Sequence, residues 1–257
     1  MKNQEIFKNL VPEVRDWIFS FYHFEEIPST QTFLLQHQTP PHSQANLCIA
    51  NNQTAGYGRQ GAPWLTPKKA ILFSLSFWIQ LPPSQLPTFP LSIAISTAQA
   101  LKEAGLLNIQ IKWPNDLYIG QAKLGGILLD ITHKTPTHTC LTLGIGLNEE
   151  ITQETTHQLP QYPITDIKTH LSSEQQQNYS FTNILCNLLF HIKKTITLFE
   201  KQKFTPFYPL WNTLDQLNHH PIIAIMPNGT TIPGIANGIT KEGYLRLLLN
   251  NGNEELI

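Results

Sequence analysis

The sequence has little charge and little cysteine. Only 14% of its 257 residues are charged, the formal net charge is -1 and no basic run is present, so nothing favours nucleic acid as a partner. The three cysteines, Cys48, Cys140 and Cys186, are odd in number and far apart. This spacing supports neither a disulfide framework nor a zinc knuckle, and we interpret all three as small buried apolar residues.

Long hydrophobic runs are also missing. The longest apolar stretch, residues 71–81, is too short to span a bilayer and contains polar residues. At the N-terminus, Glu5, Glu13 and Asp16 interrupt any stretch that could serve as a secretory signal. We therefore expect a cytoplasmic globular protein with no membrane span, long enough for one large domain and one small domain.

One glycine-rich stretch stands out, Gly56-Tyr57-Gly58-Arg59-Gln60-Gly61. Its spacing fits G-x-G-x-x-G, which in a dinucleotide-binding unit lies between a strand and a helix. Residues 47–50 fit the strand, but Pro63 and Pro67 stand where the helix should propagate. The dinucleotide interpretation therefore fails. We expect instead a mobile loop that carries Arg59 and closes over an anionic ligand.

Hydrophobic spacing and turn residues predict an α+β fold. The expected helices cover residues 4–22, a segment from Phe33 capped by Ser29 or Thr30, 92–105, 180–203 and 208–215. The expected strands cover 47–50, 71–78, 139–145 and an antiparallel meander at 109–113, 117–119 and 124–131. Residues 148–177 are expected to form a loop. Three short strands at 222–226, 231–235 and 244–249 suggest a small separate barrel, so we divide the chain into domains 1–216 and 217–257.

Two lysines flank consecutive turns of this meander, and we expect Lys112, Asp116 and Lys123 to converge on one face. Each lysine alone is better explained as part of a solvated surface ion pair. Together with Arg59, however, these groups suit a reaction that joins two anions, such as acyl adenylation with ATP. Trp64 could stack on a base, although a place in the core is an equally good interpretation.

Four motifs together resemble the biotin protein ligase family. They are the glycine-arginine loop at 56–61, Lys112-Trp113-Pro114-Asn115-Asp116-Leu117, Lys123-Leu124-Gly125-Gly126-Ile127-Leu128 and Gly144-Ile145-Gly146-Leu147-Asn148. The resemblance implies a class II synthetase-like catalytic domain, with a mixed or antiparallel sheet flanked by helices, and an SH3-like C-terminal barrel. The Ser29 motif begins early, which suggests the short type without a DNA-binding domain.

The activity that this resemblance implies has two steps. Biotin and ATP, with Mg²⁺, give biotinyl-5'-AMP, and a lysine of the biotin carboxyl carrier protein of acetyl-CoA carboxylase then takes the biotinyl group. No DNA or membrane partner is implied, and the protein would be a monomer or a homodimer. The alternatives are a lipoate-type protein ligase, whose R-R-x-S-G-G-G loop we do not find, and a catalytically silent biotin-binding module.

The resemblance also implies roles for individual residues. Catalysis would rest on Arg59, Lys112 and Lys123, and Asp116 would be a possible contact of Mg²⁺. The residues implied for biotin are Ser29, Thr30, Gln53, Gly56, Arg59, Lys123, Gly126, Gly144 and Gly146. Those implied for the nucleotide are Arg59, Trp64, Lys112, Asn115, Asp116, Lys123 and Asn148. The chain departs from the family pattern at Gln31, where S-T-N is usual, and at Tyr57, where a second loop arginine is common.

Overall fold

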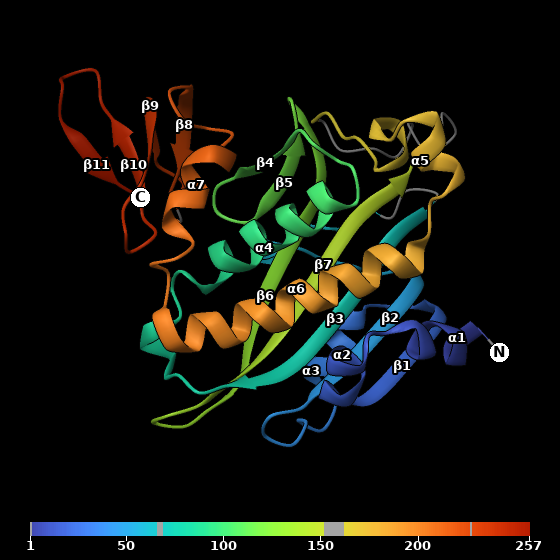
Figure 1. Cartoon of the computed structure of the whole chain (residues 1–257). Coiled ribbons are helices and arrows are strands. Elements are labelled where there is room, and N and C mark those ends of the chain that lie inside the picture. The colour runs from blue at the N-terminus through green and yellow to red at the C-terminus, as the bar shows by residue number, and fades with distance from the viewer. Residues whose placement is uncertain (1, 66–68, 152–161, 227) are drawn as a thin grey trace.

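Two sheets organise the computed structural model, which describes residues 2–65, 69–151, 162–226 and 228–257. The larger sheet has seven strands in the order β1-β2-β3-β7-β6-β5-β4, and the smaller has four in the order β11-β10-β9-β8 (Figure 1). The strands are β1 Ile18–Ile27, β2 Ala45–Gln53, β3 Lys69–Ile79, β4 Ile109–Lys112, β5 Asp116–Ile119, β6 Ala122–Lys134, β7 Thr139–Glu150, β8 Pro221–Ile225, β9 Thr231–Ile239, β10 Leu245–Leu248 and β11 Glu254–Leu256. β1 pairs with β2 in parallel, and the other pairs are antiparallel.

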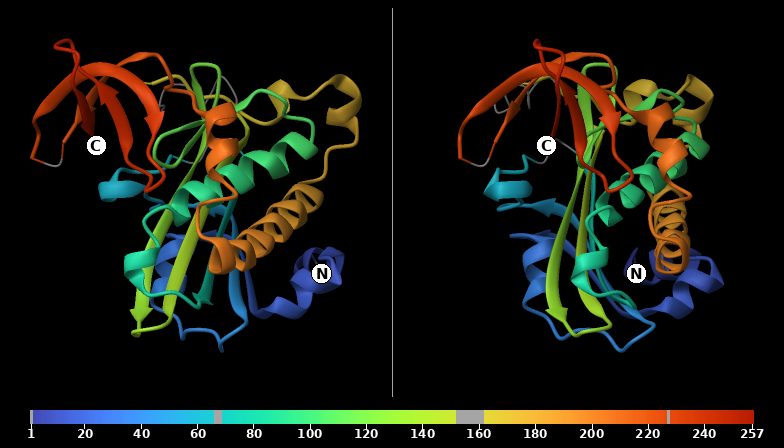
Figure 2. Two further views of the ribbon diagram at one scale, coloured as in Figure 1. Left: turned by 60° about the vertical axis from the view of Figure 1, so that its left-hand side comes forward. Right: turned by 90° about the vertical axis from the view of Figure 1, so that its left-hand side faces the viewer.

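Helices cover the large sheet unequally. They are α1 Lys2–Asn9, α2 Pro12–Trp17, α3 Thr30–Leu35, α4 Phe89–Glu103, α5 Ser173–Gln177, α6 Phe181–Gln202 and α7 Tyr208–Leu214. Figure 2 shows α4 and α6 on one side of the sheet and α3 on the other. The α4 side is the apolar core, where Phe73, Phe89 and Phe199 are all fully buried. Burying each such ring stabilises the fold by roughly 1.5–3 kcal/mol. The α3 side is less covered and holds the polar residues of the sheet.

The N-terminal segment differs from the prediction of one helix over 4–22. Pro12 cannot continue a helix, so α1 ends at Asn9 and α2 begins at Pro12. The chain then enters β1 at Ile18, which the sequence analysis did not predict. Alternating aromatic residues in β1 suit a strand paired with β2, and Trp17 packs 6.1 Å from the Phe77 ring.

Several predicted elements are confirmed. Ser29 caps α3 by accepting a hydrogen bond from Thr32 N at 3.2 Å. The helix predicted at 92–105 is α4, which begins earlier, at Phe89. Gly105 follows its end with φ 103°, a conformation that glycine adopts without strain. The antiparallel meander is present as β4, β5 and β6.

The loop predicted for 148–177 is wrong at both ends. β7 extends to Glu150 because it keeps pairing with β3 at Lys69. A short helix, α5, begins after Ser172, whose side chain forms a reciprocal capping box with Gln175. The intervening residues 152–161, like Pro67 of the glycine-loop segment, lie outside the described residues.

Of the three predicted C-terminal strands, 231–235 was too short, 222–226 is shifted by one residue and 244–249 was too long. β9 continues to Ile239, and the fourth strand, β11, pairs with β10, so the tail contains a closing strand that the sequence analysis did not predict. Trp113 Nε1 donates a 3.0 Å hydrogen bond to Gly243 O and so ties the small sheet to the meander. The predicted class, an α+β fold followed by a small β unit, is confirmed. In the described part of the chain, no helix is both long and apolar enough to cross a membrane.

Candidate functional site

The candidate site lies on the α3 side of the large sheet, around the loop between β2 and β3. Strand register places Leu72, Gly146, Gly126, Asp116 and Lys112 in one row across β3, β7, β6, β5 and β4. A second row lies two residues further along β3 and pairs Ser74 with Gly144. Because residues two apart in a strand share a face, both rows line the same surface. The predicted convergence of Lys112 and Asp116 on one face is therefore present.

A buried polar cluster forms one end of the site. Thr30 donates to Gln53 Oε1 from its backbone N, at 2.7 Å, and from its hydroxyl, at 3.1 Å. The same hydroxyl lies 2.9 Å from Ser74 Oγ. Ser29 and Thr30 are each only 3% exposed. Side chains held by this many bonds have fixed orientations, which suits recognition of a polar ring.

Glycines line the next part of the site, where the Trp64 side chain packs closely against the backbone. A Cβ on Gly146 would lie 2.8 Å from Trp64 Cζ2, and one on Gly56 would lie 3.3 Å from Trp64 Cβ. The Trp64 ring thus occupies the space that a side chain at Gly146 would fill, while Gln53 Nε2, 3.0 Å from a Cβ on Gly56, and Trp64 together fill the space beside Gly56. Its Nε1 is buried, and none of the described residues accepts a hydrogen bond from it. The geometry explains why Gly56 and Gly146 are glycines.

An ion pair follows beside Gly126. Lys123 Nζ lies 2.8 Å from Asp116 Oδ2, with side chains 16% and 28% exposed. The same ammonium lies 6.0 Å from the Trp64 ring and 5.7 Å from the Tyr162 ring. A Cβ on Gly126 would stand 3.1 Å from Asp116 Oδ1, so this glycine leaves room for the pair. The result is a partly buried cation that is balanced by one carboxylate and held beside two aromatic faces.

Lys112 adds a second cation from the neighbouring strand. Its backbone pairs with Asp116, and its Nζ lies 5.3 Å from the Tyr118 ring. Burial, followed by the charge of Asp116, raises the pKa of the Tyr118 hydroxyl to about 12. Tyr118 therefore stays neutral at physiological pH and offers Lys112 an uncharged aromatic face.

The glycine loop folds as a hairpin. Gly58 N donates to Ala62 O at 2.7 Å and Trp64 N donates to Gly56 O at 2.9 Å. Its tip is a single turn, Arg59–Gly61, with Gln60 at φ 56°. Only this 3₁₀ turn follows the glycines, which agrees with the rejection of a dinucleotide fingerprint.

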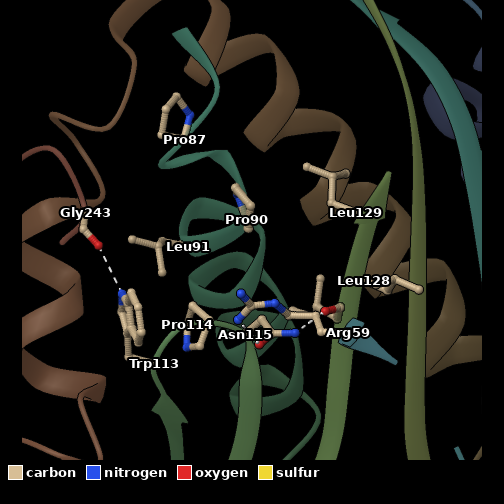
Figure 3. Close-up of a pocket in the computed structure, with 11 residues that line it drawn as sticks. Arg59, Pro87, Pro90, Leu91, Trp113, Pro114, Asn115, Leu128, Leu129 and Gly243 are labelled. Atoms are coloured by element: carbon tan, nitrogen blue, oxygen red, sulfur yellow. Dashed lines mark hydrogen bonds between the residues drawn. The ribbon is translucent and has the colours of Figure 1, made fainter. Parts of the chain in front are cut away.

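Arg59 projects from the tip toward the meander. Its side chain is exposed, and Nη1 lies 3.5 Å from Asn115 Oδ1 (Figure 3). Asn115 is held in turn, because its Nδ2 donates to Ile127 O and its O accepts from Ile127 N. Arg59 and the Asn115 turn thus lie within reach of the same ligand.

Beside Arg59 lies a cavity of about 270 Å³ with mainly apolar walls (Figure 3). Trp113, whose indole N–H is already bonded to Gly243 O, forms one wall. The remaining lining residues are Arg59, Pro87, Pro90, Leu91, Pro114, Asn115, Ile127, Leu128, Leu129 and Gly243. The cavity joins the Asn115 turn, the start of α4 and the small C-terminal sheet.

Asn148 is buried and its side-chain amide is already hydrogen-bonded. It is 4% exposed, and Nδ2 donates to Thr165 O at 2.9 Å and to Lys123 O at 3.4 Å. These bonds hold the backbone that carries Lys123. Within the described ranges, no group of three or more His, Cys, Asp or Glu residues could hold a metal ion. Asp116 is the carboxylate nearest the cations.

The sequence analysis missed residues that complete the site. Ser74 and Tyr118 face it from β3 and β5, and Gln31 is held by Asp130 and Thr142. Ser74 had a signal, because it interrupts an apolar strand on the face that the alternation marked as more polar. Asp130 had a weaker one, since it lies four residues after Gly126 on the same face of β6.

Comparisons with known proteins identify relatives of this chain. The model of the biotin/lipoate A/B protein ligase family matches residues 23–148. The chain is 32% identical to the bifunctional ligase/repressor BirA of Escherichia coli K12 over 222 residues, covering 86% of this chain and 67% of that protein. It is 33% identical to the biotin--[acetyl-CoA-carboxylase] ligase of Paracoccus denitrificans over 103 residues, 39% of this chain and 42% of that protein.

A solved structure with the same fold is the biotin protein ligase of Aquifex aeolicus in complex with biotin and ATP. Its TM-score is 0.75 at 23% identity, and the match covers 93% of this chain and 96% of that one. At this identity the likeness concerns the fold. The match extends over both sheets.

Proposed function

This chain belongs to the biotin/lipoate A/B protein ligase family, and we propose that it is a biotin protein ligase. It activates biotin with ATP to biotinyl-5'-AMP and transfers the biotinyl group to a lysine of a carrier protein. The observation that carries this proposal is the arrangement of two lysines, an arginine and a buried hydrogen-bonding cluster on one surface. Such a surface binds an uncharged polar ring at one end and neutralises anions at the other.

The ring of biotin lies at the buried cluster in this proposal. Ser29, Thr30 and Gln53 contact its ureido group, because their polar atoms are already oriented there. Gly56, Gly126, Gly144 and Gly146 contact the ring and its valeryl chain through their backbone, since a Cβ at any of them would meet a neighbouring atom within 3.1 Å. Arg59 and Lys123 bind the biotin carboxylate and the α-phosphate.

The nucleotide lies toward the meander turn. Lys112 and Lys123 reduce the repulsion between the biotin carboxylate and the triphosphate, so that a carboxylate oxygen can attack the α-phosphorus and pyrophosphate can leave. Asn115 and Asp116 lie beside this position, and Trp64 packs on the adenine. Asn148 acts by holding the Lys123 backbone.

Mg²⁺ fits this site, since it commonly uses one or two protein carboxylates together with substrate phosphates. Asp116 would hold it, and the ion would neutralise phosphate charge. No further protein ligand is required. The carboxylate also keeps Lys123 in place through their ion pair.

The second step needs an acceptor amine. A neutral lysine of the carrier attacks the acyl carbon of biotinyl-5'-AMP, AMP leaves and an amide forms. The carrier is the biotin carboxyl carrier protein of acetyl-CoA carboxylase, in the cytoplasm. We assign this chemistry to residues 1–216 and treat 217–257 as an SH3-like unit that abuts it through Trp113 and Gly243.

Mass spectrometry of a carrier domain tests this proposal. Incubation with the protein, ATP, Mg²⁺ and biotin should add one biotinyl group to a single lysine, and omission of ATP should abolish the addition. Lipoate in place of biotin is the control. Transfer of lipoate without transfer of biotin would contradict the proposal, as would binding of biotin without any transfer.

A further inference from the structure

The buried side-chain amide of Gln31, beside Thr30, has hydrogen-bond partners for its NH₂ group but none for its oxygen in the part of the chain that the structure describes. Gln31 is 4% exposed, and its Nε2 donates to Asp130 Oδ2 and to Thr142 O, each at 2.9 Å. Its Oε1 is closed to solvent, and no donor within the described residues reaches it. A buried acceptor without a donor destabilises a protein unless a ligand supplies the missing N–H or O–H.

The orientation of this amide follows from its partners. A carboxylate and a backbone carbonyl can only accept hydrogen bonds, so both must face the NH₂ group of Gln31. The amide cannot be flipped without opposing its oxygen to two other oxygens. Asp130 and Thr142 are register partners on β6 and β7, which fixes them relative to each other. Gln31 Oε1 is therefore held on the side away from Asp130.

That side is the ring end of the site. Oε1 lies 2.7 Å from the position that a Cβ would take on Gly144, and Ser74 Oγ lies 3.4 Å from the same point. Ser74 in turn lies 2.9 Å from the Thr30 hydroxyl. The unmet acceptor thus belongs to the same cluster as Thr30 and Gln53.

We propose that Asp130 is a positioning residue that holds the Gln31 amide oxygen toward the ring slot, so that the site selects a ring carrying an N–H. This inference rests on the proposed function, because the ureido ring of biotin carries two such donors. A ring of similar size without an N–H, such as the dithiolane of lipoate, leaves Oε1 unmet. The site then discriminates against lipoate because Gln31 Oε1 stays without a hydrogen-bond donor.

Ligands that differ by one N–H test the role of Gln31. Biotin-dependent ATP–pyrophosphate exchange is measured with biotin and with each of its two mono-N-methyl derivatives. Wild type should prefer biotin over at least one derivative. Gln31→Met, which keeps length but removes the oxygen, should lower kcat/KM for biotin about tenfold and leave that derivative unchanged. Equal losses for both ligands, or no loss for biotin, would overturn the proposal.

Asp130 supplies a second test. Its side chain is half-buried, so a substitution there disturbs folding less than one at Gln31. Asp130→Leu removes the acceptor and should lower the preference for biotin over the N-methyl derivative. Asp130→Asn keeps an oxygen that can face Gln31 Nε2 and should retain the preference. Loss of preference in both variants, or in neither, contradicts the proposal. If wild type shows no exchange with biotin, the proposed function fails first, whereas exchange with unchanged ligand ratios refutes the role of Asp130 alone.

Discussion

Lys123 Nζ and Asp116 Oδ2 lie 2.8 Å apart, where β5 and β6 meet beneath the Trp64 ring. The contact joins the two lysine-containing motifs of the sequence. Asp116 is also the register partner of Lys112 across β4 and β5, so the backbone pairing places Lys112 on the strand next to this ion pair. This arrangement is the electrostatic centre of the proposed site.

Lys123→Met should therefore lower exchange activity by about 10²–10³-fold, the usual loss when one donor to a developing anion is removed. The fold should be unaffected, with an unchanged melting temperature. Lys134→Met, at the exposed far end of the same strand, is the matched control and should be fully active. Similar activity in the two variants would argue against a role for Lys123 in neutralising charge.

Arg59→Ala should leave stability within about 0.5 kcal/mol of wild type, since the side chain is exposed. Retention of the adenylate should fall, because the loop loses its cation, so that free biotinyl-5'-AMP accumulates in the medium. Chromatography of the reaction mixture measures this. Arg59→Lys keeps the charge and should leak less. An adenylate that stays bound to the alanine variant would contradict the role of the loop.

The rejection of a dinucleotide site was predictable from Pro63 and Pro67, whereas the hairpin of the glycine loop was not. The four-motif resemblance is confirmed by the family comparisons. The meander was equally predictable, because its strands are separated by turns with strong sequence signals. β1 was not, since its aromatic residues follow two short helices without a glycine break. Its pairing with β2 depends on a parallel contact that no local pattern encodes.

Within the site, residue types could be predicted but several partners could not. Lys112, Asp116 and Lys123 were expected to converge, as the register requires. The bond between Gln31 and Asp130 joins residues 99 positions apart. Asn148 donates its amide to Thr165 O and Lys123 O, and its contact with the nucleotide stays a prediction. Such long-range contacts depend on the strand order.

Gly146→Ala should disturb the site through Trp64. Its new Cβ would lie 2.8 Å from Trp64 Cζ2, so the ring must move, and overpacking of this kind costs about 1–3 kcal/mol. Gly58→Ala, in the glycine loop that precedes Trp64, meets nothing closer than Ala62 O at 3.8 Å and serves as the control. The melting temperature and the biotin affinity should fall for Gly146→Ala and stay at wild-type values for Gly58→Ala. Equal melting temperatures and affinities in the two variants would show that the Trp64 ring moves without cost.

Glu149 provides a test of pH dependence. Burial raises the pKa of this carboxyl, with Lys168 and Lys69 opposing the effect. Because the pKa is higher in the folded state, the contribution to stability is full below the unfolded pKa and is lost as pH rises through the folded one. Glu149→Gln should therefore stabilise the protein at neutral pH and have little effect in acid. Melting curves at both pH values measure it, and a larger effect in acid would reverse the assigned sign.

Isotope exchange measures whether one surface joins biotin to the α-phosphate of ATP. Labelled pyrophosphate, ATP and Mg²⁺ are incubated with the protein in the presence and absence of biotin, and label in ATP is counted. We expect exchange that requires biotin and is lost in Lys123→Met. Exchange that proceeds with lipoate but not with biotin, or no exchange despite bound biotin, would contradict it.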